Sequence, residues 1–105
     1  MPHLEIKYSN DIELNIDSLF DVIEATINKL DSSAGACKSR AYSTKNYKHS
    51  HFMVDIWLLP KPHRDQKFNQ RLLEALQKVI KSQVSENCYV SLQLYYRDAN
   101  YLTIE

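Results

Sequence analysis

The chain has 105 residues, enough for one domain with a modest hydrophobic core, so we expect a single domain spanning residues 1–105. Its 13 basic and 13 acidic side chains give zero net charge, which disfavours a nucleic-acid-binding protein because such binding needs a basic excess. No apolar run approaches the ~20 residues of a membrane span, and no basic region followed by an apolar stretch marks a signal peptide. We therefore expect a cytoplasmic protein without membrane or nucleic-acid partners.

The first half of the chain predicts a strand, a helix and a strand. Leu4, Ile6 and Tyr8 alternate with charged residues, which is typical of a half-buried strand. Apolar residues at helical spacing predict a helix that begins near Asp17 or Ser18 and ends at Leu30. The polar stretch 31–35, which holds the only glycine, closes this helix, and a second strand follows over Cys37–Ser43.

The second half repeats this order. Alternation over His51–Leu59 predicts the strongest strand, which Pro60 ends. A long apolar stripe predicts a helix over Asp65–Gln83, a fourth strand covers Cys88–Tyr96, and a short tail over Tyr101–Ile104 contains apolar residues.

Two β-α-β units predict an α+β fold with one four-stranded sheet and both helices on one of its faces. The other face is then left open, and apolar residues occur on both faces of the strands, namely Trp57, Tyr89, Leu92, Leu94 and Tyr95. A chain of this length cannot easily cover both faces of the sheet, so we expect it to oligomerise.

Pro2 stands directly before the first strand, and its chemistry depends on Met1. If Met1 is removed, as is expected when a small residue follows, Pro2 becomes a free secondary amine whose ring fixes φ. The pKa of an unblocked α-amine lies close to physiological pH, and desolvation lowers it further. An N-terminal proline can therefore act as a neutral base.

The opening Met1-Pro2-His3-Leu4 with Tyr8-Ser9-Asn10, the β-α-β-β-α-β order and Lys38-Ser39-Arg40 at the second strand resemble the tautomerase superfamily. The nearest branch is 5-carboxymethyl-2-hydroxymuconate isomerase, whose members share a Met-Pro-His opening and a Ser-Arg pair on the second strand. The resemblance implies a homotrimer and a keto–enol isomerase of small unsaturated 2-hydroxy or 2-oxo acids, as in aromatic-compound catabolism. It implies no cofactor and no metal.

Residue by residue, the resemblance implies that Pro2 is the catalytic base and acid. It implies that Arg40 and Arg64 bind the carboxylate and the enolate of the substrate. The chain departs from the family in the loop before Arg64, because Leu59-Pro60-Lys61-Pro62-His63 stands where the family has a glycine-rich loop.

Each of these residues also has an ordinary structural interpretation. Arg40 and Arg64 could be surface or interface side chains, and His3, on the opposite side of its strand from Pro2, is expected to be structural. His49 and His51 have a spacing that could bind a metal, but the sequence offers no third ligand. Cys37 and Cys88 are expected to be buried, inert thiols in strands. The alternative function is a non-catalytic trimer of the same fold that binds a small acid or a protein partner.

Overall fold

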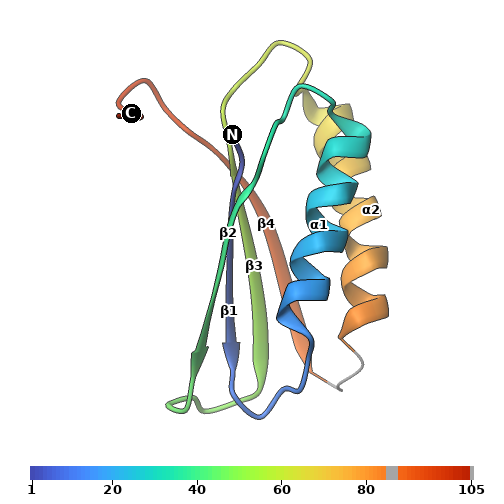
Figure 1. Cartoon of the computed structure of the whole chain (residues 1–105), viewed down its shortest axis with the longest axis vertical. Coiled ribbons are helices and arrows are strands. Elements are labelled where there is room, and N and C mark those ends of the chain that lie inside the picture. The colour runs from blue at the N-terminus through green and yellow to red at the C-terminus, as the bar shows by residue number, and fades with distance from the viewer. Residues whose placement is uncertain (85–87, 105) are drawn as a thin grey trace.

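A computed structural model describes residues 1–84 and 88–104 (Figure 1). The elements follow the order β1 (His3–Ser9), α1 (Ile16–Leu30), β2 (Lys38–Thr44), β3 (His51–Leu58), α2 (Gln66–Gln83) and β4 (Tyr89–Tyr96). Both helices lie side by side on one face of the sheet, and within the described residues the other face carries no helix. The predicted α+β class and the placement of both helices on one face are confirmed.

The sheet has the order β2-β1-β3-β4. β1 pairs with β2 in parallel, β3 pairs with β4 in parallel, and the two halves meet through the antiparallel pair β1 and β3. Each parallel pair needs a crossover connection, and α1 and α2 supply it. β2 and β4 are the edges of this sheet.

The hydrophobic core fills the space between the sheet and the helices. One face of β1 and β3 and the apolar stripes of both helices are almost fully buried, because period 2 in a strand and period 3.6 in a helix each direct one set of side chains inward. This core contains Leu4, Ile6, Leu19, Ile23, Ile27, Phe52, Val54, Ile56, Leu58, Phe68, Leu72, Leu76 and Ile80. No helix in the described residues is long and apolar enough to span a membrane.

Element boundaries differ from the sequence predictions by one or two residues. The predicted start of α1 near Asp17 or Ser18 is one or two residues too late. The helix begins at Ile16, because the Asn15 side chain caps it by accepting a hydrogen bond from the Ser18 N–H at 3.0 Å. Asp65 caps α2 in the same way by accepting from the Phe68 N–H at 2.9 Å. Cys37 and Cys88 precede β2 and β4 instead of lying within them.

The open face of the sheet carries aromatic and charged side chains. Tyr89 is 83% exposed and Tyr42 is 51% exposed, while the rings of Trp57 and Tyr95 stack with their centroids 4.3 Å apart. Large aromatic groups on a surface that no helix covers are typical of an interaction face.

Candidate active site at the N-terminal end of the sheet

Pro2 lies directly before β1 and is buried. Its carbonyl oxygen accepts a hydrogen bond from the backbone N–H of Lys38 at 2.9 Å, which extends the parallel pairing of β1 and β2 by one step. The ring of proline already fixes φ, so this bond leaves the residue little freedom. In Figure 1 the N-terminus lies at the same end of the sheet as the loops that follow α1 and β3.

A cavity of about 280 Å³ lies beside this terminus. Its lining comes from the first residues of the chain, the start of β2, the end of β3 and the C-terminal tail: Met1, His3, Lys38, Leu59, Tyr101, Leu102 and Thr103. Met1 is about half exposed and forms part of the wall. Removal of Met1 would enlarge the cavity and leave the Pro2 nitrogen at its edge, because that nitrogen is the atom to which Met1 is bonded.

Arg40 lies on the open face of the sheet beside this cavity. It pairs across the strands with Glu5 in the β1–β2 register, and its Nη2 lies 3.6 Å from the Glu5 Oε1. Its Nη1 donates to the His3 Nδ1 at 3.3 Å. A guanidinium has no acceptor atom, so His3 Nδ1 accepts and the imidazole is neutral in this contact. His3 lines the cavity, and it therefore connects Arg40 to the cavity through this hydrogen bond.

The pKa of His3 lies below its ordinary 6.5 because the imidazole is partly desolvated, and because Arg40 and Arg97 place positive charge beside it, against a smaller opposing effect of Glu5. We expect Arg40→Gln to raise the pKa of His3, because the variant removes a cation and frees the Glu5 carboxylate. An NMR titration of the imidazole protons measures this change. Arg71→Gln, on α2, should leave the titration unaltered, and an equal midpoint in Arg40→Gln would refute the contact.

Arg64 is held in a different environment from Arg40. Its Nε and Nη2 each donate to the Asp31 Oδ2 at 2.7 Å, and its Nη1 donates to the Leu59 carbonyl at 2.7 Å. The side chains of Arg64 and Asp31 are both only 3% exposed. The guanidinium is thus committed to the loop that follows α1, and we infer for Arg64 a structural role in place of the substrate-binding role expected from the sequence.

The proline-rich loop before Arg64 joins the same cluster around Asp31. His63 Nε2 lies 3.1 Å from the Asp31 Oδ2, and Lys61 Nζ donates to the Ser33 carbonyl at 3.1 Å. Burial raises the pKa of Asp31, but hydrogen bonds from Ser33, Arg64 and His63 outweigh it and hold the pKa well below the usual range. The carboxylate therefore remains charged and fastens the two loops to each other.

The sequence interpretation did not include Arg97, which follows β4. Its guanidinium carbon lies 4.4 Å from the Trp57 ring centroid and 4.6 Å from that of Tyr101. The alternation of β4 could have indicated this, since Arg97 is two residues after Tyr95 and shares its face of the strand. With Lys38, Arg40 and Arg97, three cations lie around His3 on the open face at this end of the sheet.

Other residues considered from the sequence lie elsewhere. His51 Nε2 is 2.8 Å from the Ser91 Oγ, and no three His, Cys, Asp or Glu side chains within residues 1–84 and 88–104 are grouped for a metal ion. Burial, with a smaller effect of Glu24, raises the pKa of the half-buried Cys37 to about 11, so its thiol stays protonated. Cys37 is half-buried, whereas the sequence predicted a buried thiol.

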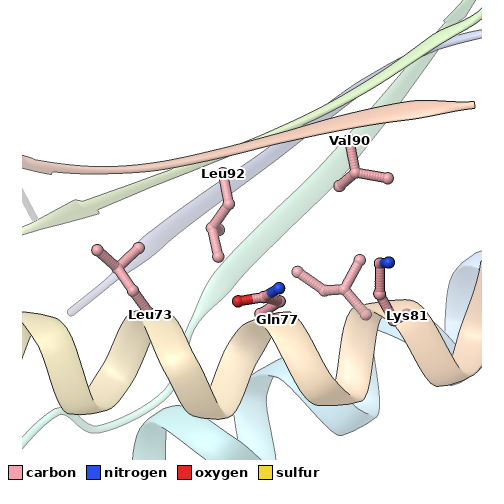
Figure 2. Close-up of a pocket in the computed structure, with 6 residues that line it drawn as sticks. Leu73, Gln77, Lys81, Val90 and Leu92 are labelled. Atoms are coloured by element: carbon pink, nitrogen blue, oxygen red, sulfur yellow. The ribbon is translucent and has the colours of Figure 1, made fainter.

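A second hollow, of about 330 Å³, lies between α2 and the edge strand β4 (Figure 2). Leu73 and Ile80 of α2 line it together with Val90 and Leu92 of β4, and among the described residues Gln77 and Lys81 add polar groups. The described residues that line it include no carboxylate, imidazole or α-amine, so it is a poorer candidate for catalysis than the N-terminal cavity.

No family model and no curated protein matches the sequence. Solved structures match over nearly the whole chain. A 5-carboxymethyl-2-hydroxymuconate delta-isomerase superposes with a TM-score of 0.82 at 13% identity, covering 100% of this chain and 88% of that one. A 5-carboxymethyl-2-hydroxymuconate isomerase from Deinococcus radiodurans R1 gives 0.78 at 18% identity, covering 98% and 88%. A fused 4-OT symmetric trimer gives 0.74 at 10% identity, covering 98% and 93%. The chain therefore has the tautomerase-like α+β fold of these proteins, as the resemblance of its sequence predicted.

Proposed function

We propose that this protein is a keto–enol isomerase acting on a small unsaturated 2-hydroxy or 2-oxo acid, with the N-terminal proline as base and acid. The observation that carries the proposal is the cavity bounded by Met1, His3 and Lys38 at the point where Pro2 enters β1. The similarity in fold to 5-carboxymethyl-2-hydroxymuconate isomerases supports a substrate of that kind.

The reaction needs only a proton shuttle and cations. The neutral amine of Pro2, once Met1 is removed, takes the proton of the 2-hydroxyl group, and the oxygen electrons form the carbonyl while the double bond shifts. The resulting prolinium returns the proton to a substrate carbon, which regenerates the amine. Arg40 stabilises the dienolate and the carboxylate, because its guanidinium is permanently charged and can bind bidentately.

The experiment has two steps. Mass spectrometry of protein made at native levels shows whether Met1 is removed. Ketonisation of 2-hydroxymuconate and phenylenolpyruvate is then followed by absorbance. Processed protein that accelerates neither reaction contradicts the isomerase proposal, and the cation cluster then supports the alternative, a non-catalytic protein that binds a small acid.

We also propose that the protein is a homotrimer. The sheet has two edge strands, β2 and β4, and an open face with exposed aromatic residues, while a similar fold occurs in a symmetric 4-OT trimer. Exposed strand edges favour pairing with another chain. We expect light scattering to give three times the 12.3 kDa of one chain. A mass of one chain at micromolar concentration would contradict the trimer.

A further inference from the structure

Arg97 differs from the other arginines on the sheet and its loops in what surrounds its charge. Arg40 lies 3.6 Å from the Glu5 carboxylate, and Arg64 lies 2.7 Å from the Asp31 carboxylate. For Arg97 no carboxylate lies within 4.0 Å among the residues that the structure describes. Its neighbours are instead the rings of Trp57 and Tyr101.

The two rings hold the guanidinium in place without using its donors. Aromatic faces attract the cation, but they offer no acceptor for the N–H groups that lie in the plane of the guanidinium. The backbone is fixed as well, since the Arg97 N–H donates to the Leu58 carbonyl at 2.9 Å. A half-buried, positioned guanidinium with an unused edge is suited to receive the two oxygens of a carboxylate.

This group lies at the proposed active site. Trp57 is the direct cross-strand partner of His3, which lines the N-terminal cavity. Tyr101 lines that cavity and also an adjoining hollow of about 250 Å³, whose walls include Trp57 and Arg97. The positive charge of Arg97 also contributes to the lowered pKa of His3. An acid in the N-terminal cavity would therefore lie beside Arg97.

We propose that Arg97 binds a carboxylate group of a small organic acid at this site, and that Trp57 and Tyr101 are positioning residues that hold its guanidinium for this purpose. The assignment of that acid as a substrate rests on the proposed function, whereas the binding itself does not.

The test uses adipate, a saturated acid that cannot be isomerised, and 1,6-hexanediol as its uncharged analogue of equal length. Isothermal titration calorimetry measures affinity, and the fluorescence of Trp57, the only tryptophan, reports binding next to Arg97. We expect Arg97→Gln to weaken adipate binding roughly 10- to 100-fold, as for loss of a charge-assisted hydrogen bond. Arg97→Lys should give an intermediate loss, because lysine keeps the charge but not the planar fork.

The matched control is Arg71→Gln, which also removes one positive charge but on α2, where Arg71 is exposed. Trp57→Leu should weaken binding and Trp57→Phe should largely restore it, a pattern that a loss of charge alone would not produce. Equal adipate affinity in Arg97→Gln and Arg71→Gln would overturn the proposal, as would a wild-type protein that does not bind adipate or binds the diol equally well.

Failure of the isomerase proposal has a different signature. In that case neither enol is ketonised by processed protein, while adipate binding and its dependence on Arg97 persist. If Arg97→Gln binds adipate as tightly as the wild type and ketonisation depends on Pro2, the isomerase proposal is supported and the proposed role of Arg97 is contradicted.

Discussion

Protein from which Met1 has been removed is expected to ketonise phenylenolpyruvate at least about 100-fold faster than protein in which the Pro2 nitrogen remains an amide. General acid–base catalysis by one positioned group contributes roughly 10²- to 10⁴-fold, and an amide nitrogen has no basic lone pair to supply it. Insertion of a leucine between Met1 and Pro2 keeps that nitrogen acylated. Initial rates by absorbance, with mass spectrometry of each sample, measure the difference.

Pro2→Ala tests whether catalysis needs the proline ring or only a free N-terminal amine. After removal of Met1 this variant has a primary amine on a less constrained residue, and we expect its rate to fall between those of the other two proteins. Circular dichroism and the oligomeric mass must be unchanged, so that a slow variant is not merely unfolded. Equal rates for processed wild type and the leucine-insertion variant would show that the Pro2 amine is not the base.

Asp31→Ala is expected to lower the free energy of unfolding by roughly 3–5 kcal/mol, because it leaves the buried guanidinium of Arg64 without its counter-charge. The variant also removes a hydrogen-bond acceptor, because the Ser33 N–H donates to the Asp31 Oδ1 at 3.0 Å. Urea unfolding followed by circular dichroism gives the value. Asp21→Ala, at an exposed position of α1, is the control and should change stability by less than about 0.5 kcal/mol.

The double variant Asp31→Ala/Arg64→Met tests the cause of this loss. Removing both charges leaves no buried unpaired ion, so we expect the double variant to be more stable than Asp31→Ala alone. If the double variant is less stable still, the loss in Asp31→Ala comes from the loop geometry and not from the stranded charge.

The lowered pKa of Asp31 predicts how the stability of the fold responds to acid. The pKa of Asp31 is lower in the folded protein than the 3.8 of an ordinary aspartate, so the folded state holds this proton less tightly than the unfolded state. The stabilisation is fully present above pH 3.8 and is lost as the pH falls below that value towards the folded pKa. Asp31→Ala should therefore flatten the dependence of stability on pH in that range.

The layers of this protein follow from local sequence patterns. The alternation in Leu4 and Ile6, the apolar stripes of the two helices and the prolines after β3 are local patterns, and each specifies the type of its element and the face that is buried. Two β-α-β units then leave few topologies, since parallel neighbours need a crossover. The position of Pro2 ahead of β1 is likewise a property of the sequence alone.

Which arginines lie near the N-terminal cavity depends on contacts between distant parts of the chain. Arg64 and Arg40 looked equivalent in the sequence, yet Arg64 is buried against Asp31, which precedes it by 33 positions, while Arg40 lies on the open face of the sheet. The environment of Arg97 could not be predicted from the sequence, because its partners Trp57 and Tyr101 lie on β3 and in the C-terminal tail. Periodicity predicts which face of an element is buried. The partner of a charged side chain depends instead on which distant loops and strands contact it in the fold, and local sequence patterns do not predict such contacts.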